Sequence, residues 1–261
     1  MRYDNRSSRI YLVAINVDFK SHIVTILLIT ALIGTSPAFA GNGDRPAPSS
    51  AGDRQPRFEH LTPDNGLLSL NTRAILQDRR GFMWFATANG LNRHDGVDFK
   101  GYLPDPADPT SLSHNNVYAL LEDRQGTLWV GTWHGGLNRY DRATDRFTRY
   151  HHKPDDPRSL SHDSVNALYE DRRGTLWVGT TVGLNRFDAA TGQFVRHLHA
   201  EGDPESLSHD TVWAITEDDQ GRLWIGTEGG LNRFEPQTGG FIRYRTDPAN
   251  PDSLGGNRVR A

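Results

Sequence analysis

Three histidines share one sequence context and carry side chains that are suited to catalysis or metal binding. His114, His162 and His209 each end a Ser-Leu-Ser-His string, and the strings recur at nearly constant intervals. Side chains that recur once per repeat are expected to be spread over the molecule, whereas the ligands of one metal ion lie about 2 Å from it. We therefore interpret these histidines as turn-capping or packing residues, and the sequence predicts neither a metal site nor a cofactor.

Acidic side chains also recur, directly before short turns that contain glycine. A carboxylate in this place is suited to accept hydrogen bonds from the backbone N–H groups of the turn. The acidic loops at 104–109, 154–157 and 247–252 lack the alternating oxygen ligands and the central glycine of an EF-hand loop, so they do not predict a calcium site. No unrepeated carboxylate pair stands out, and no catalytic residue is predicted. The repeated aspartates are Asp78, Asp123, Asp171 and Asp218.

The positions that differ between the repeats are better candidates for recognition. Some of these positions follow a Gly-Thr or Ala-Thr pair. The others are the second residue of the first expected strand of each repeat. Aromatic rings interleaved with arginine and glutamate suit a polar, ring-shaped or anionic ligand, such as a small molecule or an oligosaccharide, through stacking and charged hydrogen bonds. The candidate ligand-binding residues are Arg73, Tyr118, Trp133, His134, Asn166, Thr181, Trp213 and Glu228.

A repeated unit of short segments must position these side chains. Trp84, Trp129, Trp177 and Trp224 recur at spacings of 45, 48 and 47 residues, and each is followed by a Gly-Leu-Asn-Arg string. Segments of this length, bounded by turns rich in glycine, proline and aspartate, predict β-strands. No segment keeps a helical spacing of apolar residues for more than a turn. In one unit the expected strands are 165–171, 175–180, 183–188 and 194–198.

Four antiparallel strands per unit predict an all-β fold, a β-propeller built from four-stranded blades. One such sheet cannot bury both faces alone, so the repeated tryptophan and the leucine of Gly-Leu-Asn-Arg are expected to fill the space between blades. About four blades are present in the repeat region 57–261. Their expected bounds are 66–108, 109–156, 157–203 and 204–250, with the start of another at 251–261.

The sequence alone leaves open whether the propeller is complete and where its variable residues lie. We interpret the array as a fragment of a larger propeller, and the alternative is a closed ring of four blades. The candidate ligand-binding residues are expected to gather around one mouth of the central channel. The alternative for Tyr118 and Trp213 is that they only pack between blades.

The first 56 residues have a different composition. An apolar run at 23–34 and the sequence Thr-Ser-Pro-Ala-Phe-Ala predict a signal peptide over 1–40 that is cleaved after Ala40, and the alternative is a retained N-terminal anchor. Residues 41–56 read as a flexible linker. The chain has no cysteine, which excludes disulfides and thiolate metal sites. The net charge is −3 and no basic block stands out, so nucleic acid is not a predicted partner.

The repeat resembles that of a known family. Residues 117–132, 165–180 and 212–227 follow the pattern V-x-A-(L/I)-x-x-D-x-x-G-x-(L/M)-W-(V/I)-G-T, and the first unit departs from it at Thr72 and Ala86. This pattern resembles the two-component regulator propeller repeat. The resemblance implies a periplasmic sensor region of a membrane-anchored histidine kinase or diguanylate cyclase. It also implies that the partners of this region are signalling modules downstream, and that a dimer could form through regions outside this chain.

Three functions are therefore weighed. The first is a ligand-sensing propeller without enzymatic activity of its own, and the resemblance favours it. The second is a propeller hydrolase of the sialidase kind. Its Asp-box differs from the repeat here, in which aspartate and glycine are three residues apart rather than two. The third is a scaffold that binds another protein.

Overall fold

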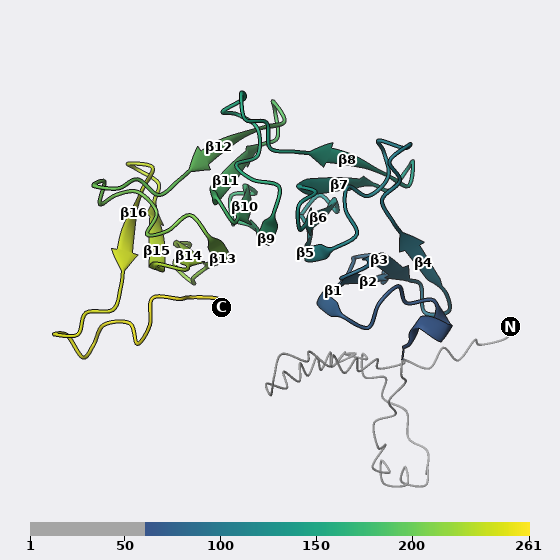
Figure 1. The fold of residues 1–261 in the computed structure, drawn as a ribbon, viewed down its shortest axis with the longest axis horizontal. Coiled ribbons are helices and arrows are strands. Elements are labelled where there is room, and N and C mark those ends of the chain that lie inside the picture. Colours follow the sequence, from purple (N-terminus) through teal and green to yellow (C-terminus); the bar gives the residue numbers. More distant parts are fainter. Residues whose placement is uncertain (1–60) are drawn as a thin grey trace, which may run out of the picture. The chain divides into compact units, whose positions relative to one another are not determined.

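The computed structural model describes residues 61–261 (Figure 1). The expected signal peptide and linker, at 1–40 and 41–56, lie outside the described residues. A 3-10 turn, Pro63–Asn65, precedes the first strand. Within 61–261, no helix has the length and hydropathy of a membrane span. The strands are β1 (Thr72–Gln77), β2 (Met83–Thr87), β3 (Gly90–His94), β4 (Phe99–Tyr102), β5 (Val117–Glu122), β6 (Leu128–Thr132), β7 (Leu137–Asp141), β8 (Arg146–Tyr150), β9 (Val165–Glu170), β10 (Leu176–Thr180), β11 (Gly183–Asp188), β12 (Gln193–His197), β13 (Val212–Glu217), β14 (Leu223–Thr227), β15 (Gly230–Glu235) and β16 (Gly240–Tyr244).

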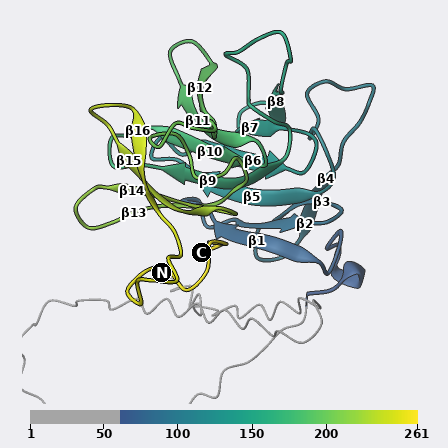
Figure 2. The ribbon, with the colours of Figure 1, turned by 60° about the vertical axis from the view of Figure 1, so that its left-hand side comes forward.

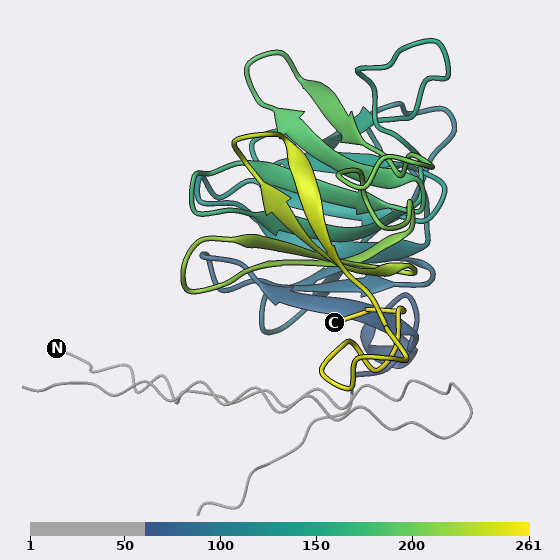
Figure 3. The same ribbon diagram turned by 90° about the vertical axis from the view of Figure 1, so that its left-hand side faces the viewer.

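The strands form four antiparallel sheets of four strands each, and within each sheet the strands pair in the order of the sequence. The innermost strands β1, β5, β9 and β13 contact one another in succession, while β4, β8, β12 and β16 lie on the outside (Figure 1). Seen from the side, the sheets lie against one another (Figure 2 and Figure 3). The predicted all-β fold of four-stranded antiparallel blades is confirmed.

The hydrophobic core lies between neighbouring sheets. The second strands, such as β6 and β10, are buried along their whole length, which explains their unbroken apolar runs. At three junctions a tryptophan ring and an aromatic ring of the next sheet pack edge to face in the same way. The ring centroids are 5.2 Å apart for Trp84 and Tyr140, 5.2 Å for Trp129 and Phe187, and 5.0 Å for Trp177 and Phe234. The expected role of the repeated tryptophan as filling between blades is confirmed.

Each repeated aspartate organises the turn between the first two strands of its sheet. Asp171 Oδ1 accepts hydrogen bonds from the backbone N–H groups of Arg173 and Thr175, both at 2.9 Å. Its Oδ2 accepts a bond of 2.9 Å from the indole Nε1 of Trp177, a contact that the sequence did not predict. The turn-binding role is confirmed. The same three bonds form at Asp78, Asp123 and Asp218.

The repeated histidines cap turns, as interpreted from the sequence. His162 Nδ1 accepts a hydrogen bond of 2.9 Å from the backbone N–H of Ser164, and His114 and His209 accept the same bond two residues on. A ring nitrogen accepts only when it is not protonated. Burial lowers the pKa of His114 and of His162, which favours the neutral ring that this contact needs.

A second contact joins neighbouring sheets at their turns. The backbone N–H of the residue after the turn aspartate donates to a glutamate that ends the innermost strand of the next sheet. These glutamates are largely buried, and the contact repeats at each of the three junctions. The pairs are Arg79 with Glu122 at 2.8 Å, Arg124 with Glu170 at 2.8 Å and Arg172 with Glu217 at 3.0 Å.

Neighbouring sheets approach closely at the glycine of the repeated Gly-Thr pair. A Cβ atom on Gly179 would lie 2.6 Å from Cγ1 of Val212 in the next sheet. We expect Gly179→Ala to lower the free energy of unfolding by about 1–3 kcal/mol, because the junction must open to hold the added methyl group. Urea unfolding followed by tryptophan fluorescence measures this. The control is Gly255→Ala, where no atom lies within 4 Å of the added Cβ, and an equal loss there would contradict the explanation.

Candidate ligand-binding site

Each innermost strand contains one irregularity, and the variable residue sits on it. The pairing of β1 with β2 shifts register between Thr72 and Ala74, so Arg73 is the extra residue of a β-bulge. The same shift isolates Tyr118, Asn166 and Trp213 in β5, β9 and β13. A bulge redirects the side chain of its extra residue and is common next to functional sites. The fold therefore places these variable side chains at the same end of the innermost strands.

The first and second sheets share a cluster of aromatic rings. The guanidinium carbon of Arg73 lies 4.3 Å from the centroid of the Tyr118 ring. Tyr118 stacks on Trp133, with 5.2 Å between centroids and 28° between planes, and Trp133 meets His134 edge-on at 5.3 Å. His134 has a φ of 71°, an uncommon backbone conformation for a residue with a Cβ atom. We call Arg73, Tyr118, Trp133 and His134 the aromatic cluster.

A second cluster, with charged side chains, lies at the fourth sheet and at the segment that follows it. Trp213 Nε1 donates a hydrogen bond of 2.6 Å to Glu228 Oε1, and Arg258 Nε donates one of 2.5 Å to Glu228 Oε2. The guanidinium carbon of Arg260 lies 4.8 Å from the Trp213 ring centroid. Burial alone would raise the pKa of Glu228, but the hydrogen bonds from Arg258 and Trp213 bring it below its usual value. We call Trp213, Glu228, Arg258 and Arg260 the charged cluster.

The two remaining predicted residues join the third and fourth sheets. Asn166 Nδ2 donates a hydrogen bond of 2.9 Å to the carbonyl oxygen of Val212. Thr181 Oγ1 lies 2.8 Å from His162 Nδ1, and the carbonyl oxygen of Thr181 accepts a bond of 3.2 Å from Thr211 Oγ1. The structure thus gathers most of the predicted residues into the two clusters and uses Asn166 and Thr181 as links between sheets.

Arg258 was missed by the prediction, and Arg260 is not among its eight candidates. Alignment of the repeats does give Arg260 as a variable position, because it holds, in the final partial repeat, the place that Trp213 holds in the preceding one. Arg258 stands where the other repeats have asparagine, serine or threonine, which is a weaker signal.

The chemistry available at the two clusters is that of recognition. Flat rings, the arginines Arg73 and Arg260, and an ionised carboxylate can stack on a ligand and hydrogen-bond to it. Among residues 61–261, no group of three or more histidine, aspartate or glutamate side chains lies close enough together to hold a metal ion.

The eight predicted site residues lie in segments shared with other proteins. The profile of the family described as two component regulator propeller matches residues 66–89, 111–134, 159–181 and 206–229. Each segment includes an innermost strand with its bulge and ends in the loop after the second strand. These are the parts of the repeat from which the predicted site residues come.

A curated relative and two solved structures are similar to this chain. Histidine kinase P4 of Formosa agariphila is 43% identical over 56 residues, which are 22% of this chain and 4% of the relative. The extracellular domain of the hybrid two component system BT3049 of B. thetaiotaomicron is 27% identical, with a TM-score of 0.53, over 72% of this chain and 32% of that one. The extracellular domain of the one component system BT4673 of the same organism has a TM-score of 0.58 at 24% identity, over 72% of this chain and 24% of that one.

The chain therefore spans a third or less of each of these proteins. The four profile matches fall one to each sheet, and the architecture is that of the extracellular domains just named. The four repeats of this chain are two component regulator propeller repeats.

Proposed function

We propose that this chain is the extracytoplasmic, ligand-sensing propeller region of a two-component or diguanylate cyclase signalling protein. The observation that carries the proposal is the bulge in every innermost strand. It directs side chains that differ between repeats, rather than repeated ones, toward one end of the strands. A site built from unlike residues on a repeated scaffold suits the recognition of one particular ligand.

The composition of the two clusters supports a small-molecule or oligosaccharide ligand with a polar or anionic character. Tyr118, Trp133 and Trp213 provide faces for stacking, and Arg73 and Arg260 provide charged donors beside them. The kinase or cyclase output belongs, in this proposal, to signalling modules beyond this chain, and the chain itself acts by binding. A periplasmic location and a dimer formed outside this chain are parts of the same proposal.

A binding screen of the full chain tests the proposal. Neutral and uronic-acid oligosaccharides are immobilised, and the affinity for any ligand found is compared with that of Trp133→Ala and Trp213→Ala. We expect each substitution to weaken binding by about 2 kcal/mol, or about thirtyfold, because buried aromatic anchors dominate such sites. Circular dichroism and the thermal midpoint verify that the variants remain folded.

The matched control is Ile242→Ala, an apolar residue that is 40% exposed on an outer strand and should leave binding unchanged. Binding that persists in both tryptophan variants would contradict a ligand site at the clusters. Cleavage of any oligosaccharide by the purified chain would favour the hydrolase alternative instead.

A further inference from the structure

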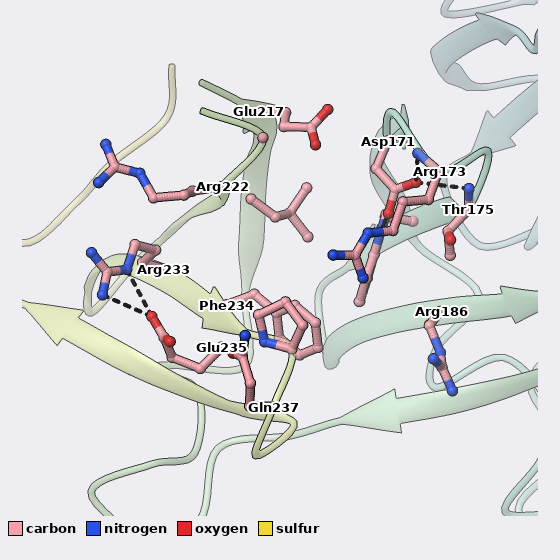
Figure 4. A pocket seen from close by; sticks show the side chains of 14 residues that line it. Asp171, Arg173, Thr175, Arg186, Glu217, Arg222, Arg233, Phe234, Glu235 and Gln237 are labelled. Atoms are coloured by element: carbon pink, nitrogen blue, oxygen red, sulfur yellow. Dashed lines mark hydrogen bonds and ion pairs between the residues drawn. The ribbon is translucent and has the colours of Figure 1, made fainter. Parts of the chain in front are cut away.

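A recess lies between the third and fourth sheets, at the end of the innermost strands opposite to the two clusters. β13 begins with Val212 and Trp213 beside the charged cluster and ends at Glu217 in this recess. The cavity has a volume of about 410 Å³. Asp171 and Trp177 line it from the third sheet, and Glu217, Phe234 and Pro236 from the fourth (Figure 4). We call it the junction cleft.

The equivalent junction between the first and second sheets holds an arginine. Arg142 Nη1 donates to Asp78 Oδ2 at 2.7 Å, Arg142 Nη2 donates to Glu122 Oε1 at 2.7 Å, and Arg142 Nε donates to the carbonyl oxygen of Gly126 at 3.0 Å. All three nitrogen atoms of the Arg142 guanidinium group therefore donate a hydrogen bond. Both carboxylates are largely buried, with side chains 0% and 8% exposed.

The repeat reproduces these acceptors in the junction cleft. Asp171, Glu217 and Gly221 hold the places of Asp78, Glu122 and Gly126, and all three line the cavity. The place of Arg142, two residues after the aromatic residue of the third strand, is held by Pro236. The fourth sheet therefore keeps the acceptor set but supplies no guanidinium to it.

The acceptors are also held as in the filled junction. Asp171 Oδ2 accepts the indole N–H of Trp177 at 2.9 Å, as Asp78 Oδ2 accepts that of Trp84. The backbone N–H of Arg172 donates to Glu217 Oε2, which leaves Oε1, the atom that binds the guanidinium in Glu122, directed toward the cleft. The Glu217 side chain is only 6% exposed. Arg172 Nε pairs with Oε2 of this carboxylate at 3.7 Å, and a cation beside Oε1 would further offset the cost of burying the charge.

The arginines around the cleft do not fill this place. Arg222 pairs with Asp218 at 2.6 Å and Arg233 pairs with Glu235 at 2.8 Å. Arg173 extends into the cleft from the turn of the third sheet, and its counterpart in the first sheet, Arg80, coexists with the bound Arg142 (Figure 4). The presence of Arg173 therefore does not by itself prevent a second guanidinium group from binding there.

We infer that the junction cleft is a binding site for a guanidinium group, the head of an arginine side chain. Asp171 Oδ2, Glu217 Oε1 and the Gly221 carbonyl oxygen accept its N–H groups, and Phe234 and Trp177 form the wall beside its planar face. This site is separate from the two clusters and does not depend on the proposed sensing function. Free arginine and an arginine residue of a partner polypeptide present the same chemistry.

Titration of the full chain with N-acetyl-L-arginine amide tests the site, with the indole N–H resonance of Trp177 as the signal. We expect a saturable shift, and binding at least tenfold weaker for N-acetyl-L-lysine amide, which lacks the planar set of donors. Free L-arginine distinguishes the sources. Tighter binding than the capped amide points to the free amino acid, whose carboxylate reaches Arg173 or Arg186, and equal or weaker binding points to a polypeptide.

Two variants decide the assignment. Glu217→Gln keeps an acceptor for Arg172 but removes the charge, and we expect at least a tenfold loss of affinity, whereas the exposed control Glu201→Gln has no effect. Pro236→Arg copies the filled junction, so it should raise the thermal midpoint and abolish the response to the amide. The inference is overturned if the wild-type chain gives no shift with the arginine amide, or if Glu217→Gln responds as the wild type does.

Discussion

Trp129→Ala is expected to lower the free energy of unfolding by about 3–5 kcal/mol, a large part of the stability of an ordinary domain. The side chain is only 4% exposed and packs on Phe187 of the next sheet. Its indole N–H also donates to Asp123 Oδ2 at 2.8 Å, so the truncation leaves a cavity and removes a donor from a buried carboxylate. Urea unfolding followed by far-ultraviolet circular dichroism measures the loss.

Two companion variants separate the causes of that loss. Trp129→Phe retains most of the packing but not the hydrogen bond, and should fall between the wild type and Trp129→Ala. Trp133→Ala removes the same kind of side chain from a half-buried place outside the core. A loss at Trp133 as large as that at Trp129 would show that the core contact between the sheets is not what matters.

The second large effect is a dependence of stability on acid that comes from His197. Burial lowers the pKa of His197 to about 4, and the nearby Arg186 adds to the shift. The ring lies among Trp177, Phe234 and Phe241, and its Nε2 has no hydrogen-bond partner among the described residues. A group whose pKa is lowered in the fold loses its contribution to stability as the pH falls below its unfolded value. His197 alone should therefore reduce the stability by about 3 kcal/mol between pH 7.5 and pH 4.

The other sheets suggest the variant that tests this. Tyr102, Tyr150 and Tyr244 pair with the leucine of Gly-Leu-Asn-Arg as His197 does in the third sheet. We expect His197→Tyr to weaken the acid dependence of the unfolding free energy by about 3 kcal/mol over that range. The control is the exposed His199→Gln, which should keep the wild-type profile because the Nδ1–H of His199 can donate to the carbonyl oxygen of Leu207 in either protonation state. A His197→Tyr profile parallel to that of the wild type would contradict a neutral, buried His197.

The fold could be predicted because the sequence pattern of each strand and turn occurs in several successive repeats. The tryptophans, the turn aspartates and the Gly-Leu-Asn-Arg strings mark the same places in every unit. The structure gives the tryptophans the same packing at the three junctions and the aspartates the same hydrogen bonds in all four sheets. At these positions the residue types that favour strands and turns are also those that can be buried between sheets. Both the strands and the contacts between sheets could therefore be predicted.

The site was only partly readable, because its geometry depends on pairing between strands. Arg73 looks like an ordinary strand residue, and only the register of β1 against β2 shows that it is the extra residue of a bulge. The contact of Arg73 with Tyr118 depends on how two sheets meet, which no single repeat contains. The junction cleft was missed for a similar reason. Arg142 and Pro236 differ in a turn, and the difference matters only once their partners in neighbouring strands are known.

The contact between turn and glutamate at each junction places unequal demands on its two sides. The donor is a backbone N–H, which every amino acid except proline provides, whereas the acceptor must be a side chain of the right length that can be buried there. The donor residue nevertheless has a second task, because the side chains of Arg79, Arg124 and Arg172 also donate to backbone carbonyl oxygens in the turn of the next sheet. Evolutionary constraint on the array should therefore fall on the length of the glutamate and on the reach of the arginine opposite it.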